Sequence, residues 1–204
     1  MEKKEIILNG KVIAYSLDYK PIFSKDEILE SVNSMISKMT HVKSDGYMFS
    51  APKKEFEDIY KFCSEVCKSI CDENSIEAKR FTLHKWISVL RSNPVQPMEL
   101  DPENNEPTYH NHKDIALRSG NTVPTYSFVF YLQMPNNLSG IDGHILLKDY
   151  EGNVLKYLPV ENEVLIFKSD IPHAPIHAKN STHNRIVLAG DFRIDNSKNI
   201  KTLI

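Results

Sequence analysis

The start of the chain carries an alternation of apolar runs and turn residues that is typical of strands. Two short apolar runs, 6–8 and 12–15, flank Asn9 and Gly10. Asn-Gly between such runs is a strong signal for a β-hairpin, because both residues adopt the positive φ angles that the tight turn requires. The sequence therefore predicts a hairpin at the N-terminus.

Helical patterns follow the hairpin. Ser24 and Glu27 have the spacing of a capping box, which marks the beginning of a helix. Apolar residues then recur at helical intervals at Ile28, Leu29, Val32, Met35, Ile36 and Met39. A second apolar stripe with helical spacing runs over about 53–72. The pattern predicts two amphipathic helices before residue 80.

Beyond residue 80 the pattern changes to short apolar runs separated by turn residues, which is typical of strands. The runs are 81–90, 126–134, 144–147, 154–158, 164–167 and 186–192. The segment 93–107 holds four prolines and several acidic residues, and is expected to be a loop. An order of two helices followed by many short strands predicts a single domain over 1–204. Helices in 1–80 would support an antiparallel β core in 81–193.

Composition and charge limit the classes of function. The 204 residues include 25 Lys and Arg against 27 Asp and Glu, a net charge of −2. This balance disfavours a protein whose main partner is nucleic acid, since such proteins normally carry a basic excess. The apolar runs are too short to span a membrane, and the first residues lack the apolar stretch of a signal peptide. We therefore expect a cytoplasmic protein without a membrane partner.

The three cysteines, Cys63, Cys67 and Cys71, are spaced four residues apart within the second helical stripe. Their apolar neighbours at helical spacing are Phe56, Ile59, Tyr60, Val66 and Ile70. Zinc and cluster sites usually use tight C-x-x-C loops, which this sequence lacks, whereas a buried free cysteine behaves as a small apolar residue. The cysteines are predicted to belong to the core.

The histidines suggest a metal site in the β half of the chain. Six of the eight lie between 110 and 183, at His110, His112, His144, His173, His177 and His183. If 109–114 is a strand, His112 and Asp114 project to the same face together with His110. An imidazole and a carboxylate presented side by side suit a borderline divalent metal.

A third ligand must come from a distant part of the chain, and His173 follows the apolar run 164–167 at a turn. Twelve residues later Arg185 opens another apolar strand, and the turn-like segment 180–184 would bring it beside the strand of His173. An arginine in an apolar strand is costly unless it meets an anion, and its planar fork matches a carboxylate. These residues predict an anion site next to the metal.

In this order the motifs resemble those of the iron(II)- and 2-oxoglutarate-dependent oxygenases, particularly the prolyl-hydroxylase-like branch and small phage and bacterial enzymes. The landmarks are Trp86, Tyr109 with His112 and Asp114, then 128–132, 143–146, 167–173 and 185–188. The resemblance implies a double-stranded β-helix, a cupin-like jelly roll that is mainly β with N-terminal helices. It implies Fe(II) held by His112, Asp114 and His173.

The same resemblance implies that Arg185 binds 2-oxoglutarate, with Tyr131 donating its hydroxyl to the same carboxylate. O2 would be the other cosubstrate, and no catalytic residue beyond the metal ligands is implied. The reaction would be hydroxylation, with a peptidyl or protein side chain as the favoured substrate and a small molecule as the other. A nucleobase is a further candidate, which the charge balance disfavours.

Several alternatives stay open at this stage. His110 competes with Asp114 as a ligand, and His177 competes with His173; Asp114 and the Ser-Asp-x-Pro-His context of His173 are favoured. Tyr131 is equally well explained as a core aromatic residue, and His144 is better explained as an ordinary strand histidine.

Two alternative functions remain. One is a non-catalytic cupin-like metal-binding module, which needs no buried arginine facing its metal. The other is a 2-oxoglutarate-independent metal-dependent dioxygenase or isomerase, which would more often use three histidines and no paired arginine.

Overall fold

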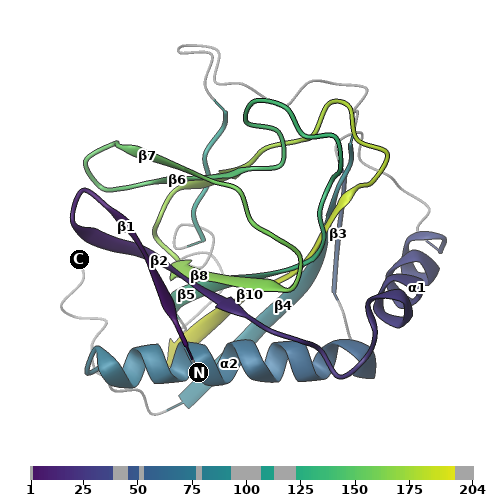
Figure 1. The fold of residues 1–204 in the computed structure, drawn as a ribbon. Coiled ribbons are helices and arrows are strands. Elements are labelled where there is room, and N and C mark those ends of the chain that lie inside the picture. The colour runs from purple at the N-terminus through teal and green to yellow at the C-terminus, as the bar shows by residue number, and fades with distance from the viewer. Residues whose placement is uncertain are drawn as a thin grey trace.

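The computed structural model describes residues 2–38, 46–50, 53–76, 80–92, 107–112 and 123–195. Its strands form two sheets that face each other (Figure 1). The large sheet has the order β1-β2-β8-β5-β10-β4-β3, and the small sheet has the order β7-β6-β9. Each of the pairings between these strands is antiparallel. This is the jelly-roll architecture that the sequence predicts.

The strands of the large sheet are β1 (Lys4–Leu8), β2 (Lys11–Asp18), β3 (Gly46–Phe49), β4 (Arg80–Leu90), β5 (Val123–Gln133), β8 (Glu163–Lys168) and β10 (Arg185–Asp195). Those of the small sheet are β6 (Ile145–Lys148), β7 (Val154–Tyr157) and β9 (His173–Pro175). The helices are α1 (Lys25–Ile36) and α2 (Glu57–Glu73), and a single 3₁₀ turn, η1 (Lys54–Phe56), leads into α2.

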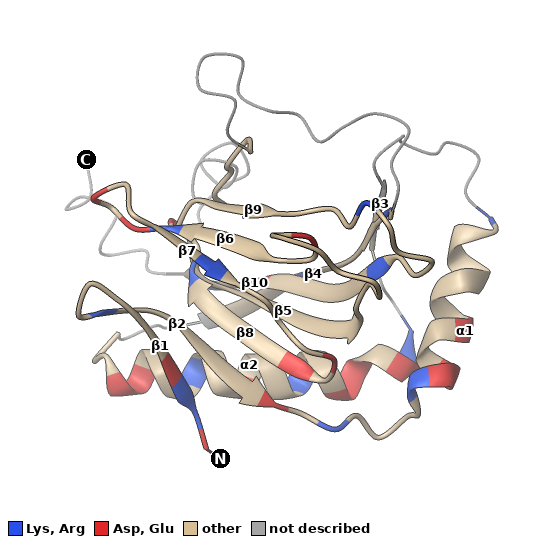
Figure 2. Ribbon diagram, turned by 45° about the horizontal axis from the view of Figure 1, so that its top comes forward, with Lys and Arg blue, Asp and Glu red and all other residues tan. Residues whose placement is uncertain are grey.

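The large sheet is covered on both faces, and the alternation of side chains along β5 sorts them between two cores. Phe128 and Phe130 pack against the helices, whereas Val129 and Tyr131 face the small sheet. Figure 1 shows α2 lying along the outer face of the large sheet, with the small sheet on the opposite side. Charged residues gather on the helices and the N-terminal hairpin (Figure 2). The outer face of the central strands is therefore apolar, whereas their inner face mixes apolar residues with buried polar ones, among them Ser127, Arg185 and Asp191.

The cysteines lie in the core between α2 and the large sheet, as predicted. Cys63, Cys67 and Cys71 are each fully buried. Burial raises the pKa of all three thiols, that of Cys71 to about 11. A neutral, inaccessible thiol is neither a metal ligand nor a nucleophile, so these residues serve packing.

The local sequence signals for the N-terminal elements are confirmed. Asn9 and Gly10 have φ angles of 52° and 75° and form the turn between β1 and β2. Ser24 caps α1: its hydroxyl accepts from the Glu27 amide at 3.3 Å, and its own amide donates to the Glu27 carboxylate at 2.8 Å.

Two strands were not predicted, and one expected segment has a different role. The strands β3 and β9 are short and lack an apolar alternation. The hairpin β1–β2 does not stand apart as support, because β2 pairs with β8 and extends the large sheet. The first 50 residues thus contribute strands as well as a helix to the domain.

None of the helices in the described segments is long and apolar enough to span a membrane. The cytoplasmic location stays a prediction.

Candidate metal centre

Three histidines meet at one end of the space between the two sheets. The ligand nitrogens of His110, His112 and His173 all lie within 4.8 Å of one another. Their rings are in contact, with centroids 4.2 Å apart for His110 and His173 and 4.9 Å apart for His112 and His173. We call these three residues the histidine cluster. Within the described part of the chain, it is the arrangement that fits a metal ion.

Backbone pairing brings the cluster together. The segment 107–112 runs beside β9: the His110 amide donates to the His173 carbonyl at 3.1 Å, and the His173 amide donates to the His110 carbonyl at 2.9 Å. The His112 amide donates to the carbonyl of Ser169, just after β8, at 2.9 Å. Two segments that are distant in the sequence are therefore held side by side by backbone hydrogen bonds.

A buried carboxylate orients His112. Asp191, on β10, is 4% exposed and lies 2.6 Å from Nδ1 of His112 through its Oδ1. The Ser127 hydroxyl, on β5, donates to the same oxygen at 2.9 Å. An ionised carboxylate only accepts hydrogen bonds, so Nδ1 of His112 carries the proton and Nε2 keeps a free lone pair. This is the arrangement that commonly supports a metal-binding histidine.

His173 is held in the same way by a backbone group. Its Nδ1 lies 3.1 Å from the carbonyl oxygen of Ile171, which leaves Nε2 as the available ligand atom. Burial lowers the pKa of His173 well below its usual value, and His110 and His112 lower it further. His110 is exposed to solvent, but desolvation by the neighbouring atoms and then the charge of His112 lower its pKa to about 4. Neutral imidazoles at pH 7 are the form that binds metal.

Arg185 begins β10 on the same inner face as Asp191, where it is 5% exposed. Its guanidinium lies 5.5 Å above the Tyr131 ring, and Nη1 donates to the His144 carbonyl over a long 3.4 Å. No carboxylate among the described residues forms an ion pair with it. Burial lowers the pKa of Arg185, a sign that its charge is poorly compensated by the protein.

The Tyr131 hydroxyl beside this guanidinium is buried and has no hydrogen-bond partner in the described structure. Burial also raises the pKa of Tyr131, so the phenol stays protonated and can donate. A buried cation and a buried donor without partners are costly, and one anion would satisfy both. The donor set fits a carboxylate ligand.

Arg185 does not lie beside the strand of His173, so this prediction from the sequence is wrong. His173 lies on β9 of the small sheet, which pairs with β6, whereas Arg185 lies on β10 of the large sheet between β5 and β4. The segment between them crosses from one sheet to the other. The two residues therefore face each other across the space between the sheets.

The remaining predicted residues are placed as follows. Asp114 lies outside the described residues. His177 is separate from the histidine cluster, and its Nδ1 lies 2.7 Å from the Arg91 carbonyl. His144 is half-buried and contributes its carbonyl to Arg185. Sequence reasoning missed Asp191 and Ser127, although an aspartate at an inward position of an apolar strand is itself a signal of a buried polar site.

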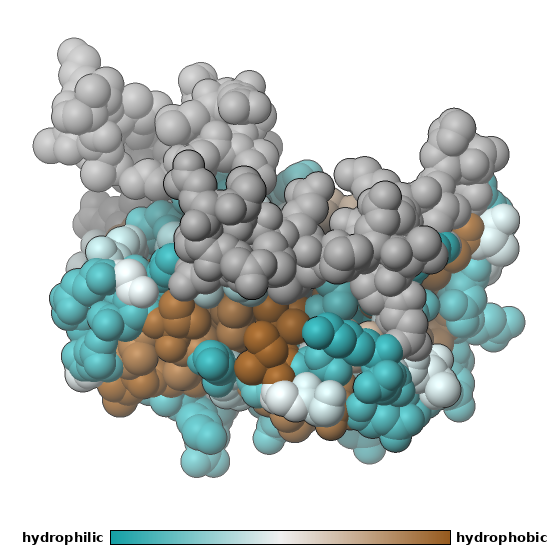
Figure 3. Space-filling model, turned by 90° about the horizontal axis from the view of Figure 1, so that it is seen from above, coloured by the Kyte–Doolittle hydropathy of each residue, from teal (hydrophilic) through white to brown (hydrophobic). Residues whose placement is uncertain are grey.

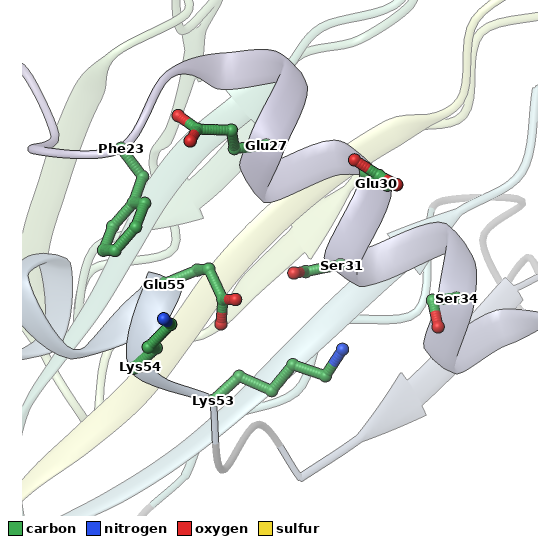
Figure 4. Close-up of a pocket in the computed structure, with 8 residues that line it drawn as sticks. All are labelled: Phe23, Glu27, Glu30, Ser31, Ser34, Lys53, Lys54 and Glu55. Carbon is green, nitrogen blue, oxygen red and sulfur yellow. The ribbon is translucent and has the colours of Figure 1, made fainter.

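A hollow lies away from the cluster, between α1 and the segment around η1 (Figure 4). Its lining mixes acidic and basic side chains: Phe23, Glu27, Glu30, Ser31, Ser34, Lys53, Lys54 and Glu55. Glu27 already serves the cap of α1, and the charges of both signs select no ligand. Apolar residues gather on part of the face that is seen from above (Figure 3).

No protein-family model and no curated protein sequence matches this chain. Solved structures do match it. The viral collagen prolyl hydroxylase of Paramecium bursaria Chlorella virus-1, in complex with 2-oxoglutarate, superposes with a TM-score of 0.53 at 12% identity, over 91% of this chain and 98% of that chain. The fold is that of the 2-oxoglutarate/Fe(II) oxygenases.

Two further structures support this statement about the fold. A prolyl hydroxylase of Trichoplax adhaerens, bound to a hypoxia-inducible factor peptide fragment, has a TM-score of 0.54 at 15% identity, over 94% of this chain and 87% of that chain. HygX of Streptomyces hygroscopicus, with nickel and 2-oxoglutarate bound, has a TM-score of 0.50 at 12% identity, over 87% and 82%. The predicted double-stranded β-helix is confirmed.

Proposed function

We propose that this protein is an Fe(II)- and 2-oxoglutarate-dependent dioxygenase that hydroxylates its substrate. The observation that carries the proposal is the pair formed by Arg185 and Tyr131, which are buried without an anionic partner on the inner face that also holds Asp191, the partner of His112. A dicarboxylate with a keto group can bind Arg185 at one end and a metal at the other. The fold and the histidine cluster agree with this role.

In this proposal His112 and His173 hold the metal through Nε2, and Asp114 supplies the carboxylate that completes the site. His110 is the alternative third ligand, since its ring already contacts His173. Two or three imidazoles with open positions suit Fe(II), and Mn, Co or Ni would also bind. When bound, iron and 2-oxoglutarate supply the oxidation, in which O2 is consumed, succinate and CO2 form, and a substrate C–H bond becomes C–OH.

The chain's own residues then have distinct tasks. Arg185 binds the distal carboxylate of 2-oxoglutarate, and Tyr131 donates its hydroxyl to the same group. Asp191 keeps the Nδ1 proton on His112, and Phe167 packs against the His173 ring at 4.8 Å and excludes water from that side. A peptidyl side chain is the substrate class we favour, because several matching structures are prolyl hydroxylases and the net charge is near neutral.

A 2-oxoglutarate-independent dioxygenase or isomerase is the second candidate function. Three histidines around one point favour it, because that ligand set needs no carboxylate. Arg185 argues against it, since such an enzyme has no use for a buried guanidinium without an anion. A non-catalytic cupin-like module is disfavoured for the same reason.

Succinate formation tests the proposal directly. The protein with Fe(II), ascorbate and 2-oxoglutarate is expected to release succinate slowly even without substrate, and a metal chelator should stop the release. The measurement is quantification of succinate against a reaction without protein. Tight metal binding with no 2-oxoglutarate binding and no succinate would instead favour the three-histidine alternative.

A substitution of Asp191 tests whether this carboxylate orients His112 for metal binding. Asp191→Asn keeps the size of the side chain but allows an amide N–H to face Nδ1 of His112, which disfavours the tautomer that binds metal. Metal affinity is expected to fall by about 10- to 100-fold, the range for groups that support a ligating histidine. Titration with Co(II) by absorbance measures it, with Asp26→Asn, a substitution at an exposed position of α1, as the control. Equal affinities in the two variants would contradict the orienting role.

A further inference from the structure

The inner face of β10 carries a second arginine beyond Asp191. The side chain of Arg193 is 14% exposed, and its Nη2 lies 3.6 Å from Oδ2 of Asp191. Its Nε is buried and finds no hydrogen-bond acceptor in the described structure. Asp191 already accepts from His112 and Ser127 through its other oxygen. The largely buried guanidinium is therefore paired with a single carboxylate oxygen at 3.6 Å, and its Nε lacks an acceptor among the described residues.

Strand register places Arg193 relative to the histidine cluster. Asp191 lies opposite His84 on β4 and opposite Ser127 on β5. The next inward position along β10 is Arg193, opposite Thr82. Because directly opposite residues of antiparallel strands share a face, these side chains form consecutive rows on the inner face of the large sheet.

Arg185 and Arg193 lie on opposite sides of Asp191, the residue of β10 that contacts the histidine cluster through His112. Arg185 precedes Asp191 by three inward positions, and Arg193 follows it by one. In the proposed function, 2-oxoglutarate occupies the stretch between Arg185 and the metal. The face around Arg193 and His84 is then left for the substrate, next to the Trp86 ring that contacts His112 edge-on at 5.4 Å.

We propose that Arg193 binds a carboxylate of the substrate and so holds the carbon to be oxidised beside the metal. A largely buried guanidinium with an unpaired Nε calls for an anion, and the planar fork matches a carboxylate in two parallel hydrogen bonds. The inference rests on the proposed function, because it assigns this side of the metal to the substrate. The carboxylate belongs either to a free carboxylic acid or to an acidic residue of a peptide.

Paired probes that differ in one charge test this assignment. N-acetylproline and N-acetylprolinamide share a ring and differ in the carboxylate, and N-acetyl-aspartyl-prolinamide carries its carboxylate on a peptide side chain. Binding is followed by the fluorescence of Trp86, the single tryptophan of the chain. The protein is loaded with Zn(II) and saturating 2-oxoglutarate, so that Arg185 is occupied and no turnover occurs.

At least one of the two acids is expected to bind about tenfold more tightly than the neutral amide, the size of one charge-assisted pair. The acid that does so identifies the source of the carboxylate. Arg193→Gln should remove this preference, and Arg193→Lys should keep part of it. The control Lys156→Gln removes a positive charge from an exposed position of β7 and should leave the preference unchanged.

The preference for acid over amide separates substrate binding from a structural role. If Arg193 only holds Asp191 in place, Arg193→Gln weakens acid and amide equally, and the proposal is overturned. Equal binding of all three probes to the parent protein overturns it as well. The affinity of the parent for 2-oxoglutarate is measured first: its absence would refute the proposed function, whereas its presence with no acid preference refutes only the role of Arg193.

Discussion

Arg185→Gln is expected to weaken 2-oxoglutarate binding by two to three orders of magnitude. The substitution removes the cation and the fork while keeping hydrogen-bonding capacity. Losing one partner of a buried, hydrogen-bonded charge pair costs roughly 2–5 kcal/mol, and each 1.4 kcal/mol is about tenfold in affinity. Isothermal titration of the Mn(II)-loaded protein with 2-oxoglutarate measures the change. Metal binding should persist, since Arg185 is not a proposed ligand.

Two milder variants show which feature of the pair matters. Arg185→Lys keeps the charge but loses the two parallel hydrogen bonds, so its affinity should lie between those of the parent and Arg185→Gln. Tyr131→Phe removes only the hydroxyl that lacks a partner in the described structure. We expect it to weaken binding by about 10- to 100-fold, because one hydrogen bond to a charged group contributes roughly 1.5–3 kcal/mol. Lys156→Gln again serves as the control.

If Arg185→Gln binds 2-oxoglutarate as tightly as the parent, the assignment of the cosubstrate fails. The assignment would also fail if the parent protein did not bind 2-oxoglutarate and Arg185→Gln were more stable than the parent. An uncompensated buried charge destabilises the fold, so its removal would then raise the free energy of unfolding. The cupin-like or three-histidine alternatives would then account better for the histidine cluster. Thermal unfolding with and without 2-oxoglutarate distinguishes these outcomes, since a ligand that binds only the folded protein raises Tm.

The features that the sequence predicts well are encoded locally. The turn at Asn9 and Gly10 and the cap at Ser24 depend on residues within a few positions, and the structure has both. The long strands β5 and β10 carry enough alternating residues to be recognised, and their inward positions include Tyr131 and Arg185. The jelly roll follows from the number of such strands and the helices that precede them.

The features that the sequence does not predict depend on pairings between distant segments. β9 has three residues, one of them a proline, and is a strand only because it pairs with β6. That pairing places His173 in the small sheet, across from Arg185, rather than beside it. No motif marks Asp191 in the sequence, and its proximity to His112 depends on how β10 faces the segment 107–112. Local periodicity carries no information about either contact.

The choice between His173 and His177 as a ligand leads to the other large expected effect. His173→Ala is expected to lower metal affinity by more than the 10- to 100-fold typical of supporting groups, because it removes a ligand atom itself. His177→Ala should bind metal like the parent, since its Nδ1 lies 2.7 Å from the Arg91 carbonyl and its ring stands outside the cluster. Co(II) titration with metal analysis measures both, and a circular dichroism spectrum checks that each variant is folded.

His110→Ala and Asp114→Asn, compared in the same titration, decide the third ligand. Loss of metal in Asp114→Asn with retention in His110→Ala would support the two-histidine, one-carboxylate site of the proposed oxygenase. The reverse result would mean that three histidines hold the metal, as their mutual distances allow. In either case Arg185 needs an anionic ligand, because its guanidinium is buried at the start of β10. This requirement does not depend on which residue completes the metal site. Retention of metal in His173→Ala and its loss in His177→Ala would overturn the assignment of the cluster.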